Sequence, residues 1–221
     1  MVERQLSPLD CLRDLDNNVC VWLNGAVEAE RPVWTRLWNH SLKRYCTDGG
    51  ANRVAHRNSE LAAPDVVIGD MDSIRPDVAE GLKRTVQLVH APDQDKTDLT
   101  KCLEFIAHDF GKDLQPHESY CLAEHQEVYC LDGENLTFVL NEGKKCIKID
   151  RQCVTGTCGV VPFCQRETIV TMTGFRWNLE DAKMAFGGMI STSNFMEEDV
   201  LHVRTSAPLI FTMELSANSL L

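Results

Sequence analysis

The residues of this sequence that are best suited to chemistry are aspartates grouped in short segments of its first half. Asp70 and Asp72 stand two positions apart, directly after the apolar run Val66 to Ile68. Two hard oxygen ligands at the end of a strand are what Mg²⁺ requires when phosphates supply its remaining positions. If the extended backbone continues past the strand, both carboxylates point to the same side. A solvated turn is the alternative, because Gly-Asp and Asp-Ser are common turn residues.

A second polar group, Asp-Gln-Asp-Lys-Thr-Asp at residues 93–98, opens the clearest amphipathic helix of the chain. Asp95 as the N-cap, with Asp98 three positions later, is an ordinary helix start. That start does not account for three carboxylates gathered with Gln94 and Lys96 after one strand. Their mutual repulsion is costly unless a cation or a ligand relieves it. We therefore expect this group to be functional.

A third group, Thr-Asp-Gly-Gly-Ala-Asn at residues 47–52, is a glycine-rich turn between a predicted strand and a predicted helix. Backbone N–H groups in such a turn can bind phosphate oxygens, although Asp-Gly-Gly is equally typical of a plain turn. The chain contains neither G-x-x-x-x-G-K-[ST] nor G-x-G-x-x-G, which disfavours Walker-type and dinucleotide-binding sites.

These groups follow the strands of a predicted parallel sheet. Short apolar runs alternate with helical patterns, and such alternation is typical of an α/β fold with helices over the sheet. Ligands of open α/β sheets bind outside the carboxyl ends of the strands, where the aspartates lie. The predicted strands are Val19–Leu23, Arg44–Cys46, Val66–Ile68 and Thr85–His90. The strongest predicted helix carries an apolar stripe from Leu99 to Phe110 and ends at Gly111.

The second half of the chain has a different pattern. Two β-rich runs flank Gly133-Glu134, which is a hairpin signal, and no convincing helix follows. We predict an antiparallel β-sandwich. The fold class is thus α/β plus all-β, with an α/β domain over residues 1–122 and a β-sandwich over residues 123–221. Beyond the hairpin, the predicted strands are 145–149, 160–163, 168–173, 185–191, 200–205 and 209–215.

The charge and the cysteine content of the chain indicate which kinds of partner and compartment to expect. With 22 Lys and Arg against 33 Asp and Glu, the formal charge of the 221 residues is −11. Such a chain repels phosphate backbones and anionic lipids, so we expect neither nucleic-acid nor membrane binding. Its ten cysteines contain no C-x-x-C pair, and we interpret them as reduced thiols, several of them buried. We expect a cytoplasmic protein.

Taken together, the three aspartate segments resemble the thiamin pyrophosphokinases of eukaryotes. The motifs are DGGANR at residues 48–53, PDVVIGDMDSI at 64–74 and DQDKTDLTK at 93–101. In the second half, TGFRWNL at 173–179 and STSN at 191–194 are similar to the thiamin-binding domain of that family. The resemblance covers nearly the whole chain, in the same order.

The resemblance implies a transferase that moves the terminal diphosphate of ATP to the hydroxyethyl oxygen of thiamin, giving thiamin diphosphate and AMP. It also implies a homodimer with thiamin held between the α/β domain of one subunit and the sandwich of the other. Its implied Mg²⁺ ligands are Asp70, Asp72 and Asp98, with Gln94 in the catalytic set. Its implied nucleotide-site residues are Asp48, Asn52, Lys96 and Thr97, and its implied thiamin contacts are Trp177, Ser191 and Asn194.

Two alternatives stay open for the thiamin contacts. Without the resemblance, Trp177 is expected in the sandwich core, and residues 191–194 are expected to form a hydrogen-bonded turn. With it, Trp177 stacks on the cationic thiazolium, a contact that contributes about 0.5–2 kcal/mol.

The chain departs from the family in one place. Between Phe110 and Glu127 the family has an apolar strand, a Gly-Gly-x-x-Gly-Arg-x-Asp loop and a helix, and this sequence has no such motif. We therefore predict a shortened α/β domain, lacking a strand, a loop and most of a helix near residues 111–120, with lower stability and weak or no activity. The competing functions are an inactive protein that binds thiamin or pairs with a complete subunit, and a Mg²⁺-dependent nucleotide hydrolase.

Overall fold

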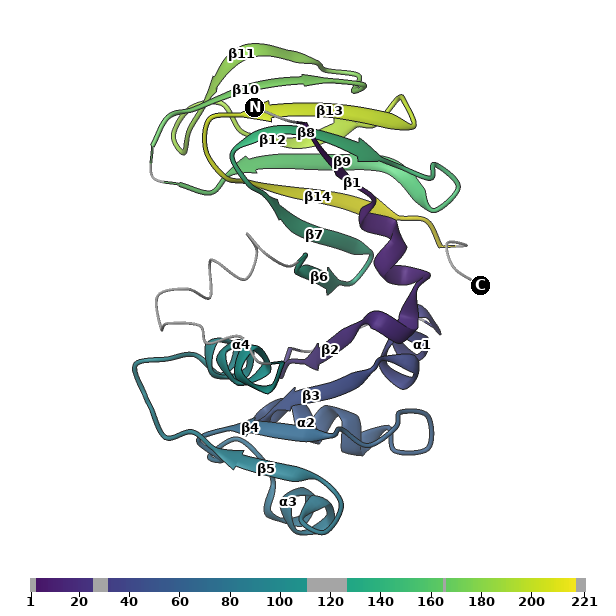
Figure 1. Ribbon diagram of the computed structural model, residues 1–221, viewed down its shortest axis with the longest axis vertical. Helices are drawn as coiled ribbons and strands as arrows, with labels where there is room; N and C mark the ends of the chain where they lie inside the picture. Colours follow the sequence, from purple (N-terminus) through teal and green to yellow (C-terminus); the bar gives the residue numbers. More distant parts are fainter. Residues whose placement is uncertain (1–2, 26–31, 111–126, 165, 218–221) are drawn as a thin grey trace. The chain divides into compact units, whose positions relative to one another are not determined.

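The computed structural model describes residues 3–25, 32–110, 127–164 and 166–217, and the chain forms two compact units (Figure 1). One unit contains the described residues from Cys11 to Phe110, and the other contains Glu3 to Asp10 together with the described residues from Glu127 onward. The first unit is α/β with a parallel sheet and the second is built from largely antiparallel strands, which confirms the predicted fold class.

The α/β unit is organised around a four-stranded parallel sheet in which every neighbour in space is also the next strand in the sequence. The strands in spatial order are β2 (Val19–Trp22), β3 (Lys43–Thr47), β4 (Val66–Gly69) and β5 (Gln87–His90). A helix joins each strand to the next, as parallel pairing requires. The helices are α1 (Pro32–His40), α2 (Asp48–His56), α3 (Pro76–Leu82) and, after β5, α4 (Asp98–Asp109). Two short 3₁₀ helices, η1 (Pro8–Leu12) and η2 (Leu15–Asn17), precede the sheet.

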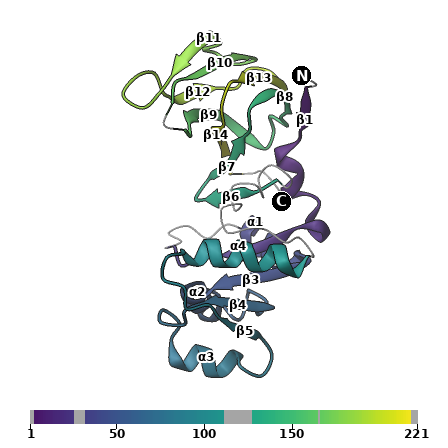
Figure 2. The same ribbon diagram turned by 60° about the vertical axis from the view of Figure 1, so that its left-hand side comes forward.

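Apolar residues cover both faces of this sheet because successive strand residues point to opposite sides. Cys46 and Val67 face one core cluster, which contains Trp38 of α1, Val54 of α2 and Val78 of α3. The alternate residues of the same strands face a second cluster with α4, made of Tyr45, Val66, Ile68, Cys102 and Ile106. Figure 2 shows α4 running beside β3. Three helices thus pack on one face and α4 on the other.

The second unit contains two five-stranded sheets, with strand orders β1-β8-β13-β10-β11 and β12-β9-β14-β7-β6. Their inward residues alternate with exposed ones, as in the buried-exposed pattern of β13. The predicted hairpin is confirmed, because β6 and β7 pair across Gly133, whose φ is +56°. The strands are β1 (Arg4–Leu6), β6 (Tyr129–Asp132), β7 (Asn135–Leu140), β8 (Gly143–Lys148), β9 (Val154–Pro162), β10 (Thr168–Thr173), β11 (Leu179–Met184), β12 (Ser191–Phe195), β13 (Val200–Thr205) and β14 (Leu209–Leu215).

The first strand and the segment before β12 differ from the sequence-based expectations. Residues 4–6 do not join the α/β unit with the rest of residues 1–122, because β1 pairs in parallel with β8 of the second unit. The strand predicted at 185–191 is wrong: β11 ends at Met184 and β12 begins at Ser191. Between them Gly187, with φ of +84°, turns the chain, since glycine adopts this conformation without steric cost.

The predicted end of the strong helix at Gly111, the predicted boundary at residue 122 and the departure between Phe110 and Glu127 all fall in residues 111–126, outside the described residues. Across the described ranges, none of the helices has the length and apolar character needed to cross a bilayer.

Candidate active site

Asp48 lies at the carboxyl end of β3, where the strand passes directly into α2. Thr47 caps this helix, its hydroxyl accepting a hydrogen bond from the backbone N–H of Gly50 at 3.2 Å. Asp48 therefore starts the first turn, and its side chain is fully buried. Its carboxylate accepts hydrogen bonds from the backbone N–H groups of Gly49 at 2.6 Å and Ser73 at 3.3 Å.

Asp70 and Asp72 follow the neighbouring strand β4, as expected, but not through a continued extended backbone. Met71 between them has φ of +67°, in the left-handed region that few non-glycine residues adopt. This turn lets the Asp72 N–H donate to Asp70 Oδ1 at 3.2 Å. Gln94 Nε2 donates to the other oxygen of Asp70 at 2.6 Å, and this hydrogen bond is the main reason that the pKa of Asp70 lies below its ordinary value.

The carboxylates of Asp48, Asp70 and Asp72 converge at this edge of the sheet. Each offers an oxygen, and these oxygens lie within 4.8 Å of one another. Burial raises the pKa of Asp48 above its ordinary value, and backbone hydrogen bonds oppose that rise. The charges of Asp98 and Asp70 also raise it, which is the electrostatic signature of acids crowded together.

Asp98 is connected to this cluster by the ion pairs of Lys101. It is the first residue of α4, and Lys101 lies three positions later on the same helix face. The Lys101 side chain is only 5% exposed, and its ammonium lies 3.1 Å from Asp98 Oδ1 and 3.9 Å from Asp70 Oδ2. Lys101 thus offsets part of the negative charge and links α4 to the strand end that carries Asp70.

The remaining predicted nucleotide-site residues have partners within the unit. Thr97, and not Asp95, is the N-cap of α4, accepting from Thr100 N–H at 3.2 Å. The Lys96 ammonium contacts both carboxylate oxygens of Glu104, at 2.9 and 2.8 Å, and this contact raises the pKa of Lys96.

Asn52 fixes the loop that follows Asp72. Its side-chain amide donates to the carbonyl of Ser73 at 2.8 Å and accepts from the N–H of Arg75 at 2.9 Å. Asn52 therefore positions the loop whose Ser73 N–H binds Asp48.

The acidic cluster fits the donor set of Mg²⁺. This ion prefers oxygen ligands, and in phosphate-transfer sites carboxylates supply some of its positions while water and substrate phosphates fill the others. Asp48, Asp70 and Asp72 supply such oxygens from two adjacent strand ends. Burial is the main cause that raises the pKa of Asp48, and the charges of Asp98 and Asp70 add to it; a divalent cation would relieve this repulsion between the carboxylates. Asp98 stands beside this set at its Lys101 contact.

The predicted thiamin contacts lie in the second unit. Trp177 is 57% exposed, so the alternative that it is a core residue is wrong. The Arg176 guanidinium carbon lies over the Trp177 ring, 5.8 Å from its centroid, so this ring already takes part in a cation–π contact.

Asn194 and Ser191 differ in their surroundings. Asn194 is buried, and its amide is bonded to the Trp177 backbone, accepting from N–H at 3.3 Å and donating to the carbonyl at 3.0 Å. Asn194 thus holds the segment that presents Trp177. Ser191 is half-buried and pairs with Val160 at the start of β12.

Sequence reasoning missed two features of this site. Asp48 was expected to line the nucleotide turn, yet it joins Asp70 and Asp72 directly. Lys101 was overlooked, although its position three residues after Asp98 on a helix was a usable signal.

Comparisons with known proteins agree on one family. The model described as "Thiamin pyrophosphokinase, catalytic domain" matches residues 34–133, and "Thiamin pyrophosphokinase, vitamin B1 binding domain" matches residues 144–210. Thiamin pyrophosphokinase 1 of Caenorhabditis elegans is 31% identical over 97% of this chain and 96% of its own length. Thiamine pyrophosphokinase 1 of rice, Oryza sativa subsp. japonica, is 32% identical, with 81% of each chain covered.

Solved structures show the same fold. The crystal structure of yeast thiamin pyrophosphokinase superposes with a TM-score of 0.84 at 19% identity, covering all of this chain and 93% of its own. The enzyme from Candida albicans gives a TM-score of 0.81 at 19% identity, with 97% and 93% covered.

Proposed function

The chain belongs to the thiamin pyrophosphokinase family, and on that premise we propose that it transfers diphosphate from ATP to thiamin, releasing AMP. The observation that carries this proposal is the convergence of Asp48, Asp70 and Asp72 at the carboxyl edge of a parallel sheet. Ligands of open α/β sheets bind at such edges, and a triphosphate needs a site that can hold its cation.

The chemistry asks mainly for positioning and charge neutralisation. The hydroxyethyl oxygen of thiamin attacks the β-phosphorus of ATP, the bond from that phosphorus to the bridging oxygen of AMP breaks, and the hydroxyl proton leaves. We assign the orientation of the hydroxyl and the acceptance of its proton to Asp98, which stands at the rim of the acidic cluster. Bound Mg²⁺, held by Asp70 and Asp72 with Asp48 or Asp98, would neutralise phosphate charge.

Gln94, Lys96 and Thr97 are proposed to position the phosphates or the thiamin end. Gln94 supports this role because it already contacts Asp70. Lys96 forms an ion pair with Glu104. Its ammonium group therefore contacts phosphate either while it stays in this ion pair or after the pair has broken. The cap hydroxyl of Thr97 orders the turn that carries Asp98.

Thiamin recognition is proposed for the second unit. Trp177 supplies an exposed aromatic ring for the thiazolium cation. Asn194 holds this residue in position through its hydrogen bond to the Trp177 carbonyl. Ser191 is assigned to a contact with the pyrimidine ring. We further propose that two chains form a homodimer. Exposed apolar side chains of the same unit, Phe186 at 67% and Met189 at 49%, support a protein contact there. Light scattering of the purified chain measures its mass.

We propose a reducing compartment, the cytoplasm, for this protein. Four buried cysteines, Cys46, Cys102, Cys146 and Cys158, are free thiols. Disulfides persist mainly in oxidising compartments, so unpaired buried thiols support this location.

The direct test measures thiamin diphosphate and AMP after mixing the chain with thiamin, ATP and Mg²⁺. We expect both products in equal amounts, and Asp70→Asn to lower their formation by about 100-fold, the upper end of the effect of a lost supporting ligand. Asp77→Asn is the matched control, because Asp77 is exposed on α3 and its carboxylate forms an ion pair with Arg75 at 3.0 Å, away from the acidic cluster. Equal loss in both variants, or none in Asp70→Asn, would contradict the proposal.

A second candidate function is a binding protein without turnover. The alignment with the worm relative extends over 236 positions, more than the 221 residues here, so that relative has residues that this chain lacks. Together with the missing Gly-Arg-x-Asp motif, this difference favours weakened chemistry. Thiamin binding without AMP release selects the binding protein, whereas AMP release without thiamin selects a nucleotide hydrolase.

A further inference from the structure

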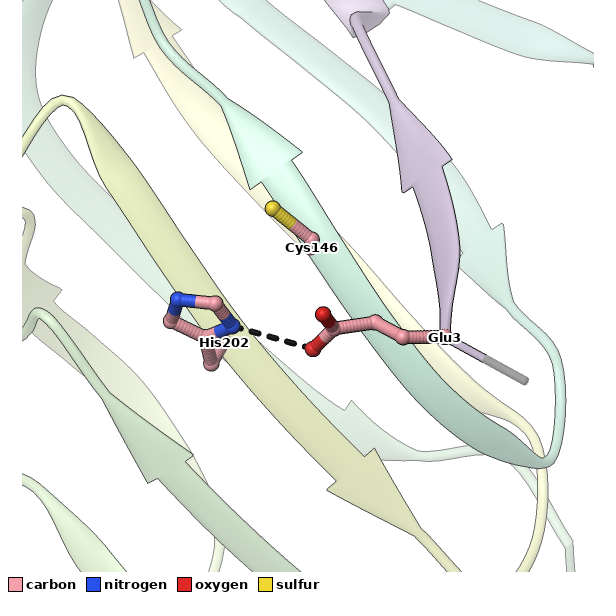
Figure 3. A group of neighbouring side chains, drawn as sticks. All are labelled: Glu3, Cys146 and His202. Atoms are coloured by element: carbon pink, nitrogen blue, oxygen red, sulfur yellow. Dashed lines mark hydrogen bonds and ion pairs between the residues drawn. The ribbon is translucent and has the colours of Figure 1, made fainter. Parts of the chain in front are cut away.

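Three potential metal ligands meet on the outer surface of the second unit (Figure 3). His202 of β13 lies directly opposite Cys146 of β8 in their antiparallel register. Glu3 immediately precedes β1, whose Gln5 pairs with Cys146 from the other side. Three neighbouring strands therefore bring a thiol, an imidazole and a carboxylate to one place.

The distances are close to those of a transition-metal site. Glu3 Oε1 lies 3.0 Å from His202 Nδ1, and one ligand atom of each residue lies within 4.8 Å of the others. Ligand atoms of a tetrahedral zinc ion stand about 3.3–3.6 Å apart, as bond lengths of about 2.0–2.3 Å require.

The burial of the three residues leaves one side open. Cys146 is 8% exposed, whereas the side chains of His202 and Glu3 are 52% and 43% exposed. A metal ion can enter from solvent, and water can fill the fourth position of a three-ligand site.

The donor types favour zinc over magnesium. Thiolate and imidazole are ligands of Zn²⁺, whereas Mg²⁺ requires oxygen. A thiolate and a carboxylate also balance the charge of a divalent ion. Lys144 and Lys148 share this face of β8 and oppose a cation, but both are exposed, so water screens their charges.

We propose that Glu3, Cys146 and His202 bind Zn²⁺ and that the ion fastens the N-terminal strand to β8 and β13. The strand β1 has three residues, which is short for a stable edge strand. A metal bond from residue 3 to residues 146 and 202 joins positions far apart in the sequence. Such closures constrain the unfolded chain most when the loop is long.

The test uses Co²⁺ as a spectroscopic probe of the full, reduced chain, with excess Mg²⁺ added to compete for the acidic cluster of the other unit. We expect one equivalent of Co²⁺ to bind with a thiolate charge-transfer band, and Zn²⁺ to displace it. Cys146→Ser should abolish the band, and His202→Asn and Glu3→Gln should weaken binding by about tenfold or more. Cys130→Ser, at an exposed cysteine of β6 in the same unit, is the matched control and should behave as the parent chain.

The proposed site is contradicted if the thiolate band survives in Cys146→Ser or if the parent chain shows no such band. The fastening role has its own readout, because Zn²⁺ should slow hydrogen exchange of the β1 amides in the parent chain and not in His202→Asn. His202 is exposed, so this variant is expected to fold normally. Unchanged exchange in the parent chain overturns the role of the ion as a fastener.

Discussion

At the scale of single residues, the position of Asp48 depends on the absence of a side chain at Gly69. A Cβ at Gly69 would lie 2.6 Å from Asp48 Cγ and 2.8 Å from Asp48 Cβ. Because Asp48 is fully buried, it has little room to move away. We expect Gly69→Ala to lower the free energy of unfolding by about 1–3 kcal/mol, as overpacking does, and to lower AMP formation by about tenfold or more. Urea unfolding and product assays measure the two effects.

Gly81→Ala is the control for that substitution. Gly81 lies in α3, and a Cβ there would meet nothing within 4 Å. Replacing a helical glycine by alanine stabilises by about 0.5–1 kcal/mol, so this variant should unfold no more easily than the parent chain. Full activity in Gly69→Ala would show that the carboxylate of Asp48 is not needed where the structure holds it.

The acidic edge could be predicted from the sequence because carboxyl ends of parallel strands share one side of a sheet. What could not be predicted was which acids meet. Asp48 reaches Asp70 because β3 and β4 are neighbours with Thr47 opposite Ile68, and pairing registers are not visible in a single sequence. The left-handed Met71 was equally hidden, since its cost is offset by the hydrogen bonds of the turn around it.

At the scale of elements, α4 is fixed to the sheet by Asp109 at its last turn. The Asp109 carboxylate accepts hydrogen bonds from the Lys43 ammonium and from the hydroxyl of Tyr45, a fully buried residue of β3. These two hydrogen bonds hold the pKa of Asp109 below its ordinary 3.8, and the bond from Lys43 has the larger effect. The stabilisation is therefore present above pH 3.8 and is lost as the pH falls through the lower folded-state value.

We expect Asp109→Asn to lower the free energy of unfolding at neutral pH by about 1–3 kcal/mol, because the amide replaces a charged acceptor. The difference from the parent chain should shrink as the pH falls from 3.8 through the lower folded-state pKa of Asp109, because its carboxyl group then becomes neutral like the amide of asparagine. Denaturant titrations at several pH values measure this change. Asp16→Asn, at an exposed aspartate of η2, should leave stability unchanged at every pH. If Asp109→Asn remains less stable than the parent chain at acid pH, then the packing of this side chain, and not its charge, holds the helix in place.

Elements with strong local patterns were predictable and those held by tertiary pairing were not. The apolar stripe of α4 and the β-rich run at 200–205 predicted both elements close to their observed bounds. The segment 185–191 has β-rich residues, yet its two glycines make the turn between β11 and β12. Only the pairing of β11 with β10 decides that the strand ends at Met184.

At the scale of the whole molecule, the chain begins in one unit, continues through the other and returns to the first. Three residues, Arg4 to Leu6, complete an edge of the sandwich sheet, and the rest of that sheet is formed after residue 142. No periodicity can be read from three residues, and the pairing partner lies about two thirds of the chain away. The sequence consequently predicted two consecutive domains, and only the pairing with β8 assigns the first strand to the second unit.

This arrangement predicts that one N-terminal side chain stabilises a unit made almost entirely of C-terminal residues. Leu6 is 7% exposed and pairs with Ile147, whereas Gln5 on the same strand is exposed. Leu6→Ala should lower the free energy of unfolding by about 2–4 kcal/mol, as buried leucine truncations do, and Gln5→Ala should change it little. Hydrogen exchange by mass spectrometry localises the effect: amides of β8 should exchange faster in Leu6→Ala, while those of β4 in the α/β unit keep their protection. Faster exchange in β4 with unchanged β8 would contradict the assignment of the first strand to the sandwich.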